Sequence, residues 1–279
     1  MLQHLILDNA GLYGTIPTEL GKLSRLQLLS LSNNQISGTI PSELASLSQL
    51  QALYLASNQI FGEIPSEIAS ILNLASVDLS FNQISGSIPS ELASLSRLQT
   101  LFLGSNQISG AIPIEFERLQ NLAYLFLDNN RLTGSFSVLG ELTQLFYLDL
   151  SQNEYNTTIP SELGRLTLLQ HLDLQLAGLK GTIPSELATL QSLTELKIYG
   201  NALSVTVPPQ LGLLPILAGF ALFDNNEVFG NISFLCERNS LLRVYIVNTN
   251  NETLRNVSCS CCKNESWRDQ SFSDINNVL

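Results

Sequence analysis

The stretch Leu26–Ser48, LQLLSLSNNQISGTIPSELASLS, returns along the chain about every 24 residues and decides the fold. A fixed period of this length is typical of a solenoid, in which one supersecondary unit stacks on the next. A solenoid exposes a long surface rather than an enclosed cleft, so binding is expected before catalysis. The leading leucine of the stretch recurs at Leu2, Leu26, Leu50, Leu74, Leu98, Leu122, Leu145, Leu169, Leu193 and Leu217.

Each unit carries the elements of a strand, a corner and a short helix. The segment L-x-L predicts a strand with its leucines buried and the intervening side chains in solvent. Gly38 permits backbone conformations closed to other residues, and Pro41 is expected to open a brief 3₁₀ or single-turn helix. Stacked in register, the strands form a parallel sheet along one side, and the short helices cover the other.

An asparagine follows each strand, where the backbone turns a corner. Its side-chain amide has donors and an acceptor for the main-chain groups of its own turn and of the next unit. Ala10 and Ala177 break this series, so weaker local order is expected at those two turns. The predicted ladder consists of Asn34, Asn58, Asn82, Asn106, Asn130, Asn153, Asn201, Asn225 and Asn250.

The repeated phrase resembles the plant-specific class of leucine-rich repeats, with consensus LxxLxxLxLxxNxLSGxIPxxLGxL, over roughly residues 1–230. The resemblance implies an α/β solenoid in the form of a right-handed arc, with one concave strand per 24-residue unit and a second short sheet built from the S-G-x-I-P segments. It also implies relatives among receptor-kinase ectodomains, receptor-like proteins and secreted inhibitors. We expect a solenoid of about ten repeats over 1–235, a last repeat with a cysteine-rich cap over 236–262, and a disordered tail over 263–279.

Charge and hydropathy exclude two classes of partner. Thirteen Lys and Arg oppose 24 Asp and Glu, a net charge of -11, so neither nucleic acid nor an anionic membrane surface is expected to bind. The longest apolar run, over 211–223, contains Pro215 and is too short to cross a bilayer. No transmembrane segment is expected in this chain. A longer protein that contains it could still have such a segment elsewhere.

The four cysteines all lie near the C-terminus, at Cys236, Cys259, Cys261 and Cys262. They are interpreted as a disulfide-closed cap over the open end of the solenoid, with three possible pairings. Strain between close neighbours favours Cys236–Cys261 with Cys259–Cys262, while a metal site is the weaker alternative. The C-x-C-C ending is similar to the cysteine caps of some secreted microalgal leucine-rich-repeat proteins, which usually carry further cysteines downstream; here there are none.

A secretory history is expected from the glycosylation signals, with a cytosolic protein of reduced thiols as the alternative. Met1 is followed at once by the first strand, without a signal peptide, so we expect the chain to be the C-terminal part of a longer protein or an incomplete gene product. The N-x-S/T sequons begin at Asn156, Asn231, Asn251, Asn256 and Asn264.

The solvent-facing strand positions suggest where a ligand binds. In the middle units they carry aromatic side chains interleaved with carboxylates, which is typical of a contact surface. The alternative is that neighbouring aromatics only stack along the sheet as cross-strand pairs. The candidate ligand-binding residues of the concave face are Tyr54, Asp78, Phe102, Tyr124, Phe126, Tyr147, Asp149, Asp173 and Lys197.

Catalysis is not expected. The chain has two histidines, His4 and His171, on strand positions without a nucleophilic cysteine nearby, and it lacks hydrolase, P-loop and kinase motifs. Asp149 and Asp173 fall on adjacent strands, yet an open face has no water-excluding pocket for them. No cofactor and no metal are expected.

The sequence therefore predicts a recognition module, receptor-like or secreted, which binds a peptide, protein or glycan on its concave face outside the cell. The alternatives are a secreted inhibitor of a partner enzyme and a structural or adhesive cell-surface protein.

Overall fold

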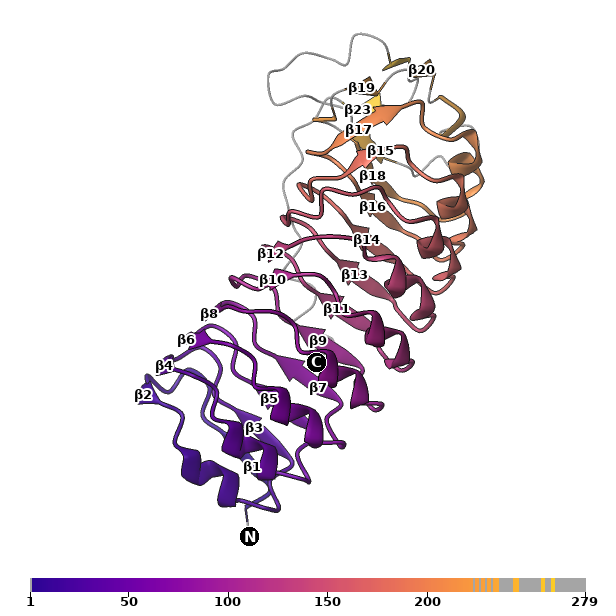
Figure 1. The fold of residues 1–279 in the computed structure, drawn as a ribbon. Coiled ribbons are helices and arrows are strands. Elements are labelled where there is room, and N and C mark those ends of the chain that lie inside the picture. Colours follow the sequence, from indigo (N-terminus) through magenta and orange to yellow (C-terminus); the bar gives the residue numbers. More distant parts are fainter. Residues whose placement is uncertain are drawn as a thin grey trace.

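The repeats stack into one elongated, twisted arc in the computed structural model (Figure 1). One strand per unit on the concave side and a short helix on the convex side confirm the predicted leucine-rich-repeat solenoid. The structure describes residues 2–222, 224–225, 227–228, 230–231, 233–235, 243–245, 257–258 and 262–263.

The concave side is a parallel sheet of twelve strands within the described residues. Its strands pair without a slip, so that Leu29 faces Leu53 and Asp149 faces Asp173 on neighbouring strands. The last strand of the sheet, β23 (Cys262–Lys263), spans the predicted boundary between the cysteine-rich cap and the tail. The strands are β1 (His4–Ile6), β3 (Leu28–Ser30), β5 (Ala52–Tyr54), β7 (Ser76–Asp78), β9 (Thr100–Phe102), β11 (Tyr124–Phe126), β13 (Tyr147–Asp149), β14 (His171–Asp173), β16 (Glu195–Lys197), β18 (Gly219–Ala221), β21 (Arg243–Tyr245) and β23 (Cys262–Lys263).

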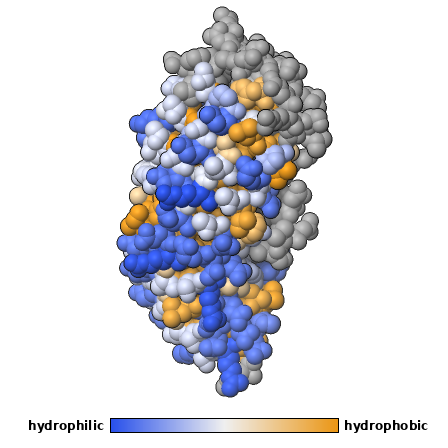
Figure 2. Space-filling view, turned by 90° about the vertical axis from the view of Figure 1, so that its right-hand side faces the viewer, coloured by the Kyte–Doolittle hydropathy of each residue, from blue (hydrophilic) through white to orange (hydrophobic). Residues whose placement is uncertain are grey.

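The convex side carries short 3₁₀ helices, as predicted. Pro41, however, is the extended residue before its helix rather than the first helical residue, with φ -69° and ψ 132°. The long face in Figure 2 is mostly hydrophilic, with scattered hydrophobic spots. The helices are η1 (Thr18–Lys22), η2 (Ser42–Ser46), η3 (Ser66–Ser70), η4 (Ser90–Ser94), η5 (Ile114–Arg118), η6 (Ser137–Glu141), η7 (Ser161–Arg165), η8 (Ser185–Thr189), η9 (Pro209–Leu213) and η10 (Ser233–Leu235).

The expected second sheet exists in separate pieces. In the second to fourth units its strands cover the residues just after the asparagine and end at or before the glycine, ahead of the Ile–Pro pair. One sheet contains β2 (Tyr13–Thr15), β4 (Gln35–Gly38), β6 (Gln59–Gly62) and β8 (Gln83–Ile84). The others pair β10 (Ser109–Gly110) with β12 (Arg131–Leu132), β15 (Lys180–Gly181) with β17 (Ala202–Val205) and β19 (Glu227–Val228), and β20 (Gly230–Asn231) with β22 (Val257–Ser258).

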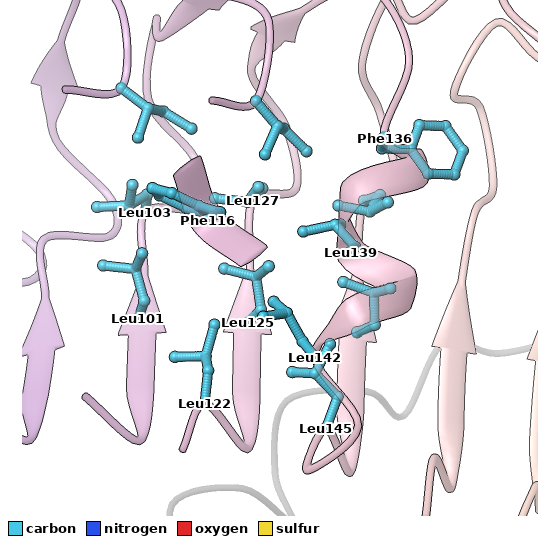
Figure 3. Packing of buried hydrophobic residues seen from close by; sticks show 14 of the residues in the cluster. Leu101, Leu103, Phe116, Leu122, Leu125, Leu127, Phe136, Leu139, Leu142 and Leu145 are labelled. Atoms are coloured by element: carbon cyan, nitrogen blue, oxygen red, sulfur yellow. The ribbon is translucent and has the colours of Figure 1, made fainter. Parts of the chain in front are cut away.

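The second sheet is missing in the seventh unit, between β12 and β15. Two aromatic residues fill the core there. Phe136 occupies the slot of the usual Ile before Pro, and Tyr155 occupies the slot two residues after the ladder asparagine. Their ring centroids lie 4.9 Å apart in an edge-to-face arrangement. Phe136 and Phe116 pack among the inner leucines in Figure 3. The sixth unit is one residue short and has no Pro in this segment, and the seventh has Asn156–Thr157 in place of Ser–Gly. These departures from the repeat correspond to an altered core and an interrupted side sheet.

The asparagine ladder forms as predicted through Asn225, while Asn250 lies outside the described residues. Asn58 shows the pattern: its Nδ2 donates to Leu31 O at 2.9 Å and Leu55 O at 3.1 Å, and its Oδ1 accepts from Ile36 N. Each asparagine thus satisfies backbone groups of the preceding unit as well as its own turn. Because such groups cost about 1–3 kcal/mol each when buried without a partner, the ladder holds the corners together.

The two interruptions of the ladder are compensated by the next asparagine. Asn34 Oδ1 accepts from both Ala10 N and Leu12 N, and Asn201 Oδ1 accepts from both Ala177 N and Leu179 N. The backbone donor of each alanine therefore has a partner, and the expected weakness at these turns stays a prediction.

Candidate functional site: a groove on the concave face

A groove crosses the concave strands of the first six units. Its volume is about 540 Å³, and it spans from Asp8 after β1 to Asp128 after β11. Four of the predicted residues line it: Tyr54, Asp78, Phe102 and Phe126. The groove is the place where the structure gathers predicted concave-face residues around an open space.

Small side chains form the floor of the groove. The position after the last strand leucine is occupied by Ser32, Ala56, Ser80 and Gly104 in the second to fifth units. Equivalent positions in neighbouring units lie about 4.8 Å apart in a sheet. The floor and its two acidic ends therefore extend over about 24 Å, and an extended chain of about seven residues has that length. The small size of these side chains is what hollows the face.

The groove is acidic. Asp8, Asp78 and Asp128 line it, whereas no lining Lys, Arg or His occurs among the described residues. Asp8 Oδ1 accepts from Ser30 Oγ at 2.6 Å, and Asp78 Oδ1 accepts from Ser80 Oγ at 2.6 Å. Burial raises the pKa of Asp78 despite the hydrogen bonds from Ser80, which lower it. Burial and the charge of Asp149 raise the pKa of Asp128 to about 7.

The aromatic residues on the strands of the middle units are stacked on one another. Phe102 meets Phe126 edge to face at 4.6 Å, Phe126 stacks on Tyr147 at 4.6 Å, and Tyr147 stacks on His171 at 4.9 Å between ring centroids. Tyr124 stacks on Phe146 at 6.3 Å. The alternative of cross-strand stacking is thus observed. The expectation that all these positions face solvent is wrong for Phe126, which is 5% exposed, because its neighbours cover its ring.

The remaining candidate residues form a charge network in units seven to nine. Lys197 Nζ lies 3.4 Å from Asp173 Oδ2 and 3.9 Å from Glu195 Oε1, and Glu195 Oε2 lies 3.2 Å from His171 Nδ1. Burial and then Asp149 raise the pKa of Asp173 well above its usual value, although Lys197 opposes this. Asp149, Asp173 and Lys197 are all buried, so the prediction that they are exposed is also wrong.

Sequence reasoning missed part of the groove. Asp8, Phe81 and the floor residues were not predicted as binding residues, although the column of small residues is readable in the repeat alignment. A second hollow of about 720 Å³ lies beside the interrupted side sheet, lined mainly by serine, threonine and proline. It holds none of the predicted residues.

Most of the predicted cysteine and glycosylation sites lie outside the described residues. These sites are Cys236, Cys259, Cys261, Asn251, Asn256 and Asn264. Of Cys262 and Asn231 only the backbone is described, in β23 and β20. Asn156 is exposed, and its Nδ2 donates to Glu154 O at 2.9 Å. The pairing and the glycosylation stay predictions.

Two further findings concern the described residues alone. No cluster of three or more His, Cys, Asp or Glu side chains there is arranged to hold a metal ion. Within the same residues, none of the helices has the length and apolar character needed to cross a membrane.

Comparison with known proteins identifies the class. Leucine-rich-repeat family models match residues 1–60, 73–132 and 144–166. No curated protein sequence matches significantly. Together with the repeat and the fold, these matches show that the chain belongs to the leucine-rich-repeat family, in its plant-type form.

Similar solved structures come from several kinds of protein. The ectodomain of the Arabidopsis receptor kinase HAESA, in complex with a peptide hormone, is 32% identical with a TM-score of 0.74 over 79% of this chain and 41% of its own. A plant ice-binding protein is 30% identical with a TM-score of 0.72 over 82% and 74%. A leucine-rich-repeat protein of Leptospira interrogans is 29% identical with a TM-score of 0.76 over 94% and 67%. The chain covers 47%, 45% and 51% of three other receptor structures, about half their length.

Proposed function

We propose that this chain is a non-catalytic recognition module, part of a receptor-like or secreted protein outside the cell, and that it binds an extended peptide along the concave groove. The groove of about 540 Å³ between Asp8 and Asp128 carries the proposal, because its length fits a peptide lying across the strands. Phe81 is 46% exposed at its edge and offers apolar contact area. The similarity to receptor structures with bound peptide hormones supports a peptide over a glycan.

A groove-filling variant tests this proposal. Ala56 lies on the floor, and Ala56→Trp would place a large ring where the peptide backbone is expected. Leu72→Trp introduces the same side chain at an exposed position that does not line the groove. Peptides selected from a phage-displayed random heptapeptide library would bind the Ala56→Trp variant at least tenfold more weakly and the Leu72→Trp variant unchanged. Equal binding to all three proteins would rule out the groove.

The extracellular setting is supported by the similarity to receptor ectodomains and by the clustered cysteines and sequons. Mass mapping of native protein under non-reducing conditions is expected to find Cys236 linked to Cys261 and Cys259 linked to Cys262. Four free thiols would contradict a secretory history and favour the cytosolic alternative.

Ice binding is a second candidate, favoured by one observation. Gln35, Gln59 and Gln83 are exposed at the first positions of β4, β6 and β8, and the exposed Gln107 continues the row at the same 24-residue interval. Such a periodic polar row can match a crystal lattice, and the similar ice-binding protein is covered over 74% of its length. Inhibition of ice recrystallisation that is lost in Gln59→Lys with Gln83→Lys would support this function. Inactivity of the unaltered protein at millimolar concentration would exclude it.

A further inference from the structure

Asp128 differs from the other carboxylates of the groove. It is 7% exposed, lines the groove at its C-terminal end and lies directly over Gly104, where an added Cβ would overlap its carboxylate. Asp8 and Asp78 accept hydrogen bonds from serines. The Asp128 carboxylate instead accepts a hydrogen bond from its own backbone N–H. Among the described residues, no other residue donates a hydrogen bond to it or forms an ion pair with it.

Such a carboxylate is costly to bury. A charge that leaves water without a counter-ion loses much of its solvation, and burial together with the charge of Asp149 raises the pKa of Asp128. A cationic ligand group placed against the carboxylate would offset the loss. The ring of Phe102 also lines the groove, and an aromatic face attracts a desolvated cation. The end of the groove therefore has two features that favour a positive charge.

We propose that the groove selects a basic peptide and that an Arg or Lys side chain of this peptide pairs with Asp128 against the ring of Phe102. This inference rests on the proposed function and names the ligand class of the same site. Asp8 at the opposite end, about 24 Å away, would take a second cation about seven residues along the peptide. The lining contains no basic side chain among the described residues, so an acidic peptide would find no positively charged partner there.

A peptide cation fits this site better than a metal ion. A metal ion needs several ligands converging on one point, and the described residues hold no such cluster. A buried carboxylate beside the ring of Phe102 instead matches a guanidinium or an ammonium group, which brings its own apolar stem. The floor of small residues leaves room for the backbone of the ligand.

The test compares the same peptides with two protein variants. Heptapeptides are selected from a random phage-displayed library, and synthetic copies are titrated against the unaltered protein, Asp128→Asn and Glu67→Gln. Glu67 is exposed on η3 of the convex side, so its variant has the same change in net charge away from the groove. Each peptide is also made with its Arg replaced by citrulline, or its Lys by norleucine, which removes the charge and keeps the shape.

The expected result has three parts. First, the selected peptides are enriched in Arg or Lys. Second, replacing that residue by its neutral analogue raises Kd at least tenfold for the unaltered protein and for the Glu67→Gln variant. Third, the same replacement changes Kd less than twofold for the Asp128→Asn variant. The peptide-side change requires no protein variant to fold. Peptides that need an open groove but show no basic residue would overturn this inference and leave the proposed function standing. Failure to select any peptide would overturn both.

Discussion

The two halves of the concave face share one backbone register and treat charge in opposite ways. In units seven to nine, Lys197 contacts Asp173 and Glu195, and Glu195 contacts His171, so that negative charges lie beside basic groups. In the first six units, Asp8, Asp78 and Asp128 line a groove with no basic side chain among the described lining residues. The repeat determines the positions of these side chains. Their identity determines whether the carboxylates of a surface lie beside basic groups of the same chain or are left to interact with those of a ligand.

The largest effect is expected from removing the cation of the C-terminal half. Lys197→Met would leave Asp173 buried beside Asp149 without the opposing ammonium group, and the free energy of unfolding should fall by about 3 kcal/mol. Urea unfolding at pH 7 measures it. Lys180→Met, at an exposed position in β15, is the control and should change stability by less than about 0.5 kcal/mol. Equal losses in both variants would show that the network does not hold the fold.

In the N-terminal half, removing a charged side chain is expected to raise the free energy of unfolding instead of lowering it. The folded protein holds a proton on Asp128 up to about pH 7, whereas the unfolded chain releases it near 3.8. Between these values the folded state binds more protons, so stability falls as the pH rises. Asp128→Asn removes this penalty and should raise the free energy of unfolding at pH 8, with little change at pH 4. Unfolding curves at the two pH values test this; a gain of the same size at pH 4 would contradict it.

A third comparison uses one substitution in both halves. Gly104→Ala would push a methyl group into the Asp128 carboxylate, whereas the Cβ of Gly219→Ala would meet Glu195 Cγ at an ordinary 3.5 Å. The first variant should lose about 1 kcal/mol of stability and bind groove peptides at least fivefold more weakly. The second should be nearly neutral in both. Thermal melting and peptide titration separate them, and identical behaviour would mean that the end of the groove is not closely packed.

The smallest effect provides a baseline for the charge comparisons. Arg165 and Glu141 form an ion pair on the surface of η7 and η6, with both side chains about half exposed. Glu141→Gln should cost less than about 0.5 kcal/mol, since exposed pairs gain little over solvation. A loss as large as that of the Lys197→Met variant would show that the net charge of the whole chain, and not the burial of the ion pair, determines how much stability is lost.

The fold could be predicted from the sequence because its signal is repeated many times. The strand register followed as well, and Asp149 does face Asp173. What could not be predicted is exposure: alternation places Phe126 on the outer face, but only the packing of Phe102 and Tyr147 shows that its ring is covered.

The interrupted side sheet was equally hard to foresee. The sequence showed a shortened sixth unit and an unusual seventh, yet the contact between Phe136 and Tyr155 is a property of the packed core. The groove lay within reach of sequence reasoning, because its floor is one column of small residues that ends in Asp128. That no described basic side chain lies in its lining is a property of the folded chain, which the repeat pattern does not contain.

The asparagine ladder has a consequence for synthesis on the ribosome. Asn58 completes the corner of the unit that precedes it, through Leu31 O and Ile36 N. A newly made repeat therefore keeps unpaired corner groups until the next one has emerged and folded onto it. Because chains leave the ribosome N-terminus first, the most recently folded repeat always lacks the hydrogen bonds that the next repeat supplies. The solenoid therefore folds one repeat at a time, behind the point that translation has reached.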